Sequence, residues 1–166
     1  MQRHRESTVS IVAAPDELFA FIDDHSRFAS HMSQPSWMMG GGHMVVDVDA
    51  AQGQAVGSHI RIGGKVFGIR LFLDEVVTVR NPPTEKIWET VGSPKLLVIG
   101  SYRMGVEITP DTRASRLRVF IDYDLPSGLT LMLGWLFGDF YARWCVQQML
   151  AGASDHFARR RRVEGA

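Results

Sequence analysis

Hydrophobic and polar positions divide the chain into an opening strand and helix, a long middle region of period two, and a final helical region. Residues 6–13 alternate, with Val9 and Ile11 on one face, which predicts a half-buried strand. Pro15 then stands where a first helical turn tolerates proline. We therefore expect a strand, a short helix that begins at Pro15, and a second short helix at about 25–31.

The middle of the chain reads as strands joined by short turns. The clearest alternation covers 116–125, where apolar side chains from Leu117 to Leu125 occupy every second position. Turns are predicted at 81–83, 93–94 and 110–111 from proline, asparagine and aspartate. Short turns between successive strands predict an antiparallel sheet with one buried face.

The last quarter of the chain predicts one long helix over about 128–160. At 100° per residue, one apolar arc of this helix would face the core; it contains Leu129, Leu133, Leu136, Phe137, Phe140, Trp144, Gln147, Ala151 and Ala158. The opposite face would carry Leu131, Trp135 and Met149, which suggests a homodimer contact or a membrane contact. Residues 159–166 would form a frayed basic tail. We expect its arginines to complement the negative end of the helix dipole rather than to bind anionic lipid.

This order of elements predicts an α+β fold. A sheet of six or seven antiparallel strands, with one apolar face, would wrap around the C-terminal helix. Because a twisted sheet cannot contact a straight helix along its whole length, a cavity is expected between them. The two short helices would close one end, and residues 1–166 would form a single domain.

Composition narrows the function. The chain has 166 residues with eighteen basic and eighteen acidic side chains, so it offers no electrostatic case for a nucleic-acid partner. The single cysteine, Cys145, fits a reducing compartment. The first residues lack the apolar segment of a signal peptide, and the longest apolar stretch is too interrupted for stable membrane insertion. We therefore expect a cytoplasmic protein.

Metal and cofactor chemistry find little support in the sequence. His25 and His31 are six residues apart rather than three or four, and no cysteine pair or HExxH motif is present, so neither a metal nor a cofactor is predicted. These histidines are expected at the surface or in a lid. Among ionisable side chains, Lys65 and Glu75 have inward parity in the predicted sheet and are the sheet's candidates for acid–base work.

Four segments carry a resemblance to a known family: VSIVAAPDELFAFIDD, PPTEKIWETVG, VEITPDTRASRLRVFIDYDLP and MLAGASDHFARR. With them the chain resembles the START-like, or SRPBCC, superfamily, especially its polyketide cyclase/dehydrase-like and lipid-transport-like branch. The resemblance covers nearly the whole chain and implies the helix-grip fold. It also implies a ligand cavity, but no family motif assigns individual pocket residues.

Parity and helical angle select the residues that would line this cavity. The predicted lining residues are Phe67, Ile69, Trp88, Tyr102, Met104, Tyr123, Phe140 and Trp144. For each one an ordinary core position is the alternative, and at Trp88 the neighbouring Ile87 and Glu89 compete for the inward face. Gln147, inside the apolar arc, would anchor a ligand or bond to Tyr102 or Tyr123.

Three functions remain open at this point. The first is binding, with or without transport, of a hydrophobic small molecule such as a lipid, a quinone or a polyketide-like ring. The second is a cyclase or dehydratase that uses the same cavity, which would need an acid–base pair inside it. The third is a protein–protein module that uses the face of Leu131, Trp135 and Met149.

Overall fold

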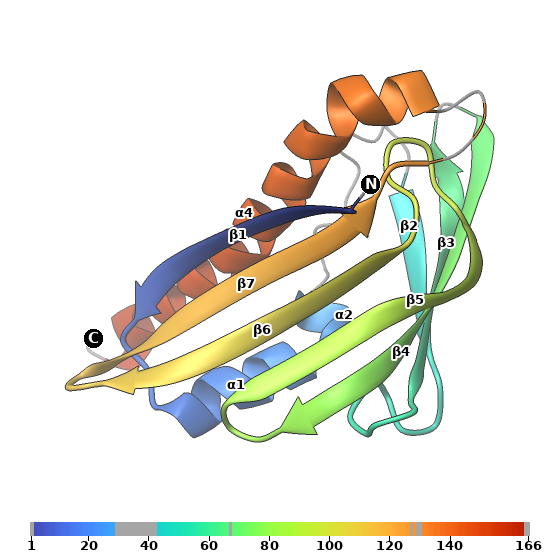
Figure 1. Cartoon of the computed structure of the whole chain (residues 1–166). Coiled ribbons are helices and arrows are strands. Elements are labelled where there is room, and N and C mark those ends of the chain that lie inside the picture. The colour runs from blue at the N-terminus through green and yellow to red at the C-terminus, as the bar shows by residue number, and fades with distance from the viewer. Residues whose placement is uncertain (1, 29–42, 67, 127, 129–130, 165–166) are drawn as a thin grey trace.

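The computed structural model describes residues 2–28, 43–66, 68–126, 128 and 131–164. Figure 1 shows one curved sheet with a long helix lying across it. The strands are β1 (Gln2–Ile11), β2 (His43–Val48), β3 (His59–Val66), β4 (Ile69–Asn81), β5 (Glu85–Lys95), β6 (Tyr102–Asp111) and β7 (Ala114–Asp124). The helices are α1 (Pro15–Asp23), α2 (His25–Phe28) and α4 (Leu131–Glu164).

All seven strands pair antiparallel in the order β1-β7-β6-β5-β4-β3-β2. The first strand therefore closes against the last, with Gln2 opposite Asp124 and Ile11 opposite Ser115. The short helices α1 and α2 follow β1 along the chain, and β2 lies at the opposite edge of the sheet from β1 (Figure 1). The predicted α+β, helix-grip architecture is confirmed.

The hydrophobic core lies between the sheet and the helices. Alternate residues of β6 and β7, including Met104, Val106, Val119 and Ile121, pack with Leu18 and other apolar side chains of α1 and α4. A smaller cluster is formed by Met44, Ile60, Ile62, Leu73 and Val77 on the inner side of β2, β3 and β4. Such alternation is what a sheet with one buried face requires.

The prediction for the inward face of α4 is wrong. Its buried face carries Gly134, Gly138, Ala142, Cys145, Val146, Met149, Ala153 and Phe157. Of the predicted arc, Leu133, Leu136, Phe137, Phe140, Gln147 and Ala151 are exposed. A Cβ built on Gly138 would lie 2.8 Å from the Val98 oxygen, so the glycine face brings the helix close to the chain beneath it. Both faces are apolar, and the one with small residues allows the closer approach.

Several boundaries also differ from the predictions. Residues 93–94 continue β5 rather than turning, and the strand extends to Lys95. Residues 159–164 are helical rather than frayed, because α4 continues to Glu164. The expected helical residues 29–31 and the pocket residue Phe67 lie outside the described residues. No helix in the described part of the chain combines the length and the apolar content needed to cross a bilayer.

Candidate functional site

Three polar side chains from distant parts of the chain meet inside the molecule. Glu75 projects inward from β4, Tyr102 begins β6, and His25 is the first residue of α2. The Tyr102 hydroxyl donates a hydrogen bond to Glu75 Oε1. His25 Nε2 lies 3.4 Å from Glu75 Oε2, and both of these side chains are only 2% exposed. We refer to His25, Glu75 and Tyr102 as the buried polar cluster.

Hydrophobic and backbone neighbours fix the position of the imidazole in this cluster. The ring of His25 stands edge-on to Trp88, with 5.2 Å between the centroids. On another side lies Gly53, where a Cβ would be only 3.5 Å from the His25 Cβ. Gly53 has a φ of +72°, a conformation that glycine adopts readily, so the β2–β3 loop can lie close to the histidine.

A cluster of ion pairs holds the end of α1, which lies just before His25 in the chain. Asp23, the last residue of α1, receives hydrogen bonds from Arg80 of β4, with 2.8 Å from Nη2 to Oδ2. The ammonium of Lys86, on β5, lies 3.1 Å from Asp23 Oδ1 and 3.1 Å from the Asp23 carbonyl oxygen. Because Asp23 is two residues before His25, these contacts tie the start of α2 to the β4–β5 hairpin.

Two atoms of the buried polar cluster have unused hydrogen-bonding capacity. Within the described part of the chain, His25 Nδ1 and Glu75 Oε2 have no hydrogen-bond partner although both are buried. A buried polar atom without a partner costs about 1–3 kcal/mol. Native structures keep few such atoms, so each one calls for an explanation such as a functional role or a bound water or ion.

Burial keeps three groups of β6 and α4 at the site protonated. Burial raises the pKa of Tyr102 well above its usual range, and the charge of Glu75 raises it further. Burial likewise raises the pKa of Tyr141 on α4, and that of its neighbour Cys145 to about 12. At neutral pH these three groups are therefore protonated, and Cys145 is a thiol rather than a thiolate nucleophile.

The site can bind a polar group within an apolar interior and can move a proton. Glu75 Oε2 offers an acceptor, Tyr102 holds the other carboxyl oxygen in place, and His25 offers a second titratable group. Within the described residues, no three His, Cys, Asp or Glu side chains gather as a metal site would need.

The sequence matches the family described as "Polyketide cyclase / dehydrase and lipid transport" over residues 2–161. The chain belongs to this family. The match confirms the resemblance drawn from the four sequence segments. No curated protein matches the chain by sequence.

Solved structures of other proteins share the fold of this polyketide cyclase/dehydrase and lipid transport family member. The Zhui aromatase/cyclase from Streptomyces sp. R1128 superposes with a TM-score of 0.71 at 15% identity, covering 100% of this chain and 99% of that one. Norcoclaurine synthase from Thalictrum flavum gives 0.65 at 11% identity, with coverages of 93% and 92%. Ara h 8.0201 gives 0.58 at 8% identity, with coverages of 96% and 99%. At these identities the likeness shows the fold alone.

The residues predicted to line the cavity are found in several different environments. Trp88, Met104 and Tyr123 are buried in the core, and Trp144 is half-buried against it. Tyr102 lies in the buried polar cluster, whereas Ile69 and Phe140 are exposed. Gln147 is exposed, so the prediction that it projects inward is wrong, because α4 turns its glycine face to the sheet.

Other sequence-based expectations are corrected or extended by the site. Glu75 does face inward, but Lys65 is exposed on the outer face of the sheet. His25 was expected at the surface or in a lid and is buried instead, because the β2–β3 loop packs against it. Met149 is buried, so it cannot belong to the outward face expected for a homodimer. The inward position of Glu75 could be predicted from its place in the strand alternation, whereas no pattern in the sequence predicted the burial of His25.

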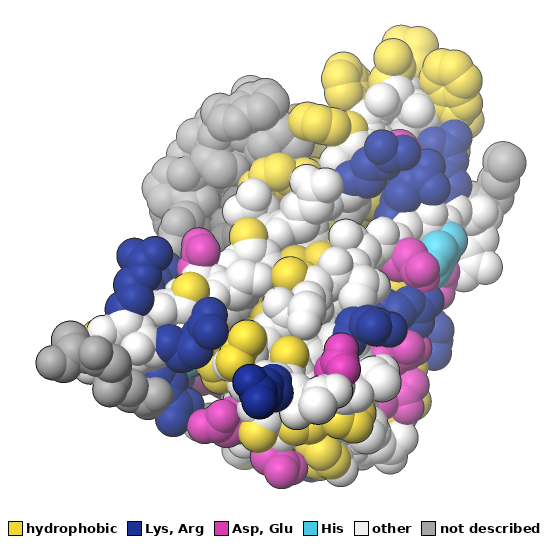
Figure 2. Space-filling model, turned by 90° about the vertical axis from the view of Figure 1, so that its left-hand side faces the viewer, with side chains coloured by type: hydrophobic (Ala, Val, Ile, Leu, Met, Phe, Trp, Pro, Cys, Tyr) yellow, Lys and Arg dark blue, Asp and Glu magenta, His cyan; other side chains and the backbone are white. Residues whose placement is uncertain are grey.

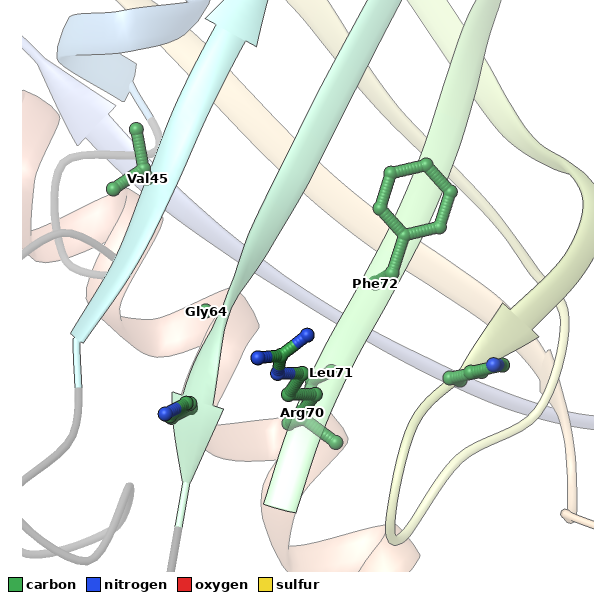
Figure 3. Close-up of a pocket in the computed structure, with 7 residues that line it drawn as sticks. Val45, Gly64, Arg70, Leu71 and Phe72 are labelled. Carbon is green, nitrogen blue, oxygen red and sulfur yellow. The ribbon is translucent and has the colours of Figure 1, made fainter. Parts of the chain in front are cut away.

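A concave region lies at the edge of the sheet formed by β2, β3 and β4, apart from the buried polar cluster (Figure 3). This basic hollow has a volume of about 770 Å³ and is lined by Val45, Gly64, Lys65, Arg70, Leu71, Phe72 and Lys95. Figure 3 shows Arg70 and Phe72 projecting from β4, with Val45 on β2 across the intervening β3. The lining contains three cations and no carboxylate.

Proposed function

We propose that the protein binds a hydrophobic small molecule between the sheet and α4, and that the buried polar cluster holds the polar end of this molecule. One observation carries the proposal. His25 Nδ1 and Glu75 Oε2 are buried without hydrogen-bond partners among the described residues, in an interior otherwise rich in aliphatic and aromatic side chains. A ligand that supplies the missing hydrogen bonds would remove their desolvation cost.

The chemistry of the cluster indicates the polar group of this ligand. Glu75 Oε2 accepts a hydrogen bond, so its partner must be a donor such as a hydroxyl or a phenol. A ligand carboxylate at the same place would be repelled by the Glu75 charge. A hydroxylated ring or chain, of the lipid, quinone or polyketide-like kind, satisfies both requirements. The family, which is described by lipid transport as well as by cyclisation, supports such a ligand.

Native mass spectrometry of freshly purified protein, followed by titration with defined probes, tests the proposal. We expect 2-naphthol to bind more tightly than naphthalene, which lacks the hydrogen-bond donor, and more tightly than 2-naphthoate, which carries a negative charge. Glu75→Gln should weaken binding of 2-naphthol about tenfold or more, because one hydrogen bond to a charged group is worth at least 1.4 kcal/mol. Equal affinity for naphthol and naphthalene would contradict the role of the cluster.

Glu89→Gln is the matched control for this variant. Glu89 lies on the neighbouring strand β5, pairs with Arg103 at 3.5 Å and is 43% exposed at its side chain. We expect it to leave naphthol affinity unchanged. Gln147→Leu should also leave affinity unchanged, because Gln147 is exposed.

A second candidate function is catalysis of a cyclase or dehydratase type. The observation that favours it is the presence of a carboxylate and an imidazole 3.4 Å apart inside the protein. In a dehydration, Glu75 would take a proton from the carbon beside a carbonyl, and protonated His25 would give its proton to the departing hydroxyl. The C–H and C–O bonds break, a C=C bond forms and water leaves.

Incubation with a β-hydroxy ketone such as 4-hydroxy-4-phenyl-2-butanone separates the two functions. Catalysis would be established if the protein removes one water from this probe and if Glu75→Gln and His25→Gln abolish the reaction. Glu89→Gln should leave the reaction intact. Tight binding of 2-naphthol without any such turnover would leave binding as the function that the cluster serves.

A further inference from the structure

Cations without acidic partners gather at one edge of the sheet. Lys65, Arg70 and Lys95 line the basic hollow, and none of them forms an ion pair with a residue that the structure describes. Further along the same outer face the charges are paired, as Arg61 is with Asp74 at 3.7 Å. The unpaired positive charge is therefore a local feature of the end of the sheet that lines the basic hollow.

Hydrophobic side chains stand exposed among these cations. Phe72 projects from the outer face of β4 and is 48% exposed, and Val45 on β2 is more exposed still (Figure 3). Ile69, next to Arg70 at the start of β4, is also exposed. The patch thus combines one aromatic and two β-branched side chains with three unpaired cations. Such a combination fits contact with an anionic, partly apolar surface better than exposure to water.

The exposed start of α4 lies at the same end of the molecule. In Figure 1 the first turn of α4 and the start of β4 both lie at the top, and Figure 2 shows hydrophobic side chains gathered at the upper end. Met132 is 70% exposed and Trp135 is 65% exposed. The chain after β5 connects the two regions, because Lys95 lines the hollow and the Val98 oxygen would lie 3.0 Å from a Cβ on Gly134.

We propose that this end of the molecule docks on an anionic membrane surface. Lysine and arginine side chains near such a surface are attracted to its lipid headgroups, and tryptophan and phenylalanine favour the interfacial layer. A second copy of the chain fits less well, because a symmetric contact would bring the three unpaired cations of each copy together. The attachment is peripheral: α4 contributes its first turns and does not cross the bilayer.

The size of the expected effect follows from the three cations. Each lysine or arginine near an anionic surface contributes about 1 kcal/mol, or about fivefold in partitioning, so three contribute about a hundredfold. The protein as a whole has a formal net charge of zero, so it has no general attraction to anionic vesicles. Binding to such vesicles must therefore come from a local patch.

Co-sedimentation with vesicles tests the proposal on the full chain. We expect binding to phosphatidylcholine vesicles that contain phosphatidylserine, much weaker binding to phosphatidylcholine alone, and loss of the difference at high salt. The triple variant Lys65→Gln, Arg70→Gln, Lys95→Gln should lose about a hundredfold in partitioning to the anionic vesicles. Trp135→Ser should weaken binding to them as well.

Matched controls remove the same charge and a hydrophobic side chain at the other end of α4. The triple variant Arg159→Gln, Arg161→Gln, Arg162→Gln and the single variant Val163→Ser should bind as the unaltered protein does. All of these side chains are exposed, and equal thermal unfolding temperatures would verify that each variant folds. Absence of binding to anionic vesicles, or equal loss in the two triple variants, would overturn the proposal. So would a concentration-dependent dimer, seen by light scattering, that Trp135→Ser dissociates.

Discussion

Replacing Asp23 with asparagine takes the negative charge away from a buried lysine. Lys86 is completely buried, and its ammonium is 3.1 Å from Asp23 Oδ1 and 3.1 Å from the Asp23 carbonyl oxygen. In the Asp23→Asn variant the carbonyl remains but the carboxylate does not. Burial of Lys86 already lowers its pKa, which shows how strongly the interior disfavours the uncompensated ammonium.

The expected destabilisation is large. Removing one partner of a buried ion pair costs about 3–5 kcal/mol, because the other charge stays buried without compensation. For a chain of this size 1 kcal/mol corresponds to roughly 2–4 °C in melting temperature, so we expect a decrease of about 10 °C. Adding Lys86→Met should recover most of the loss, since a hydrophobic side chain of similar length needs no counter-charge.

Urea denaturation followed by circular dichroism measures this loss, with Asp24→Asn as the control. Asp24 is the next residue, and its ion pair with Arg27 is exposed, with side-chain exposures of 37% and 66%. Exposed pairs contribute about 0–1 kcal/mol, so Asp24→Asn should change stability little. If Asp23→Asn cost no more than Asp24→Asn, the reasoning about the buried pair would be refuted.

The same pair predicts a dependence on pH. Burial opposes ionisation of the Asp23 carboxyl, but the hydrogen bonds from Arg80 and the charge of Lys86 outweigh it and hold the pKa below its usual value. The stabilisation is therefore complete above the unfolded pKa of about 3.9 and is lost as pH falls through the lower, folded pKa. Asp23→Asn should lose less stability than the unaltered protein when pH is lowered below about 4.

Three further predictions concern α4 and the buried polar cluster. Gly138→Ala should destabilise the protein by about 1–3 kcal/mol, because its Cβ would lie 2.8 Å from the Val98 oxygen. Gly152→Ala, with open space around it, should stabilise the protein by about 0.5–1 kcal/mol. Thermal unfolding compares the two variants. Cys145 should resist Ellman's reagent at neutral pH in the folded protein and react once urea unfolds it, since burial raises its pKa to about 12; rapid reaction in the native state would contradict its burial. Tyr102→Phe should lower the free energy of unfolding by about 1–3 kcal/mol, because Glu75 Oε1 loses its donor; no change in the urea midpoint would contradict that role.

The sequence by itself determined the order and kind of the elements. Alternation from Leu117 to Leu125 identified β7, and Pro15 marked the start of α1, because both signals depend on local geometry. Short turns then required an antiparallel sheet, and a long apolar helix required burial against it. The parity of Glu75 placed its carboxyl inside, since neighbouring strand residues must face opposite sides.

Only the tertiary structure decided which face of α4 is buried and which residues form the site. Both faces of the helix are apolar, so hydrophobicity could not choose between them; the close approach allowed by Gly134 and Gly138 did. The buried polar cluster joins His25, Glu75 and Tyr102 from α2, β4 and β6, and no local pattern encodes a meeting across such separations. Their convergence depends on the register of the sheet and on the ion pairs that fix the end of α1.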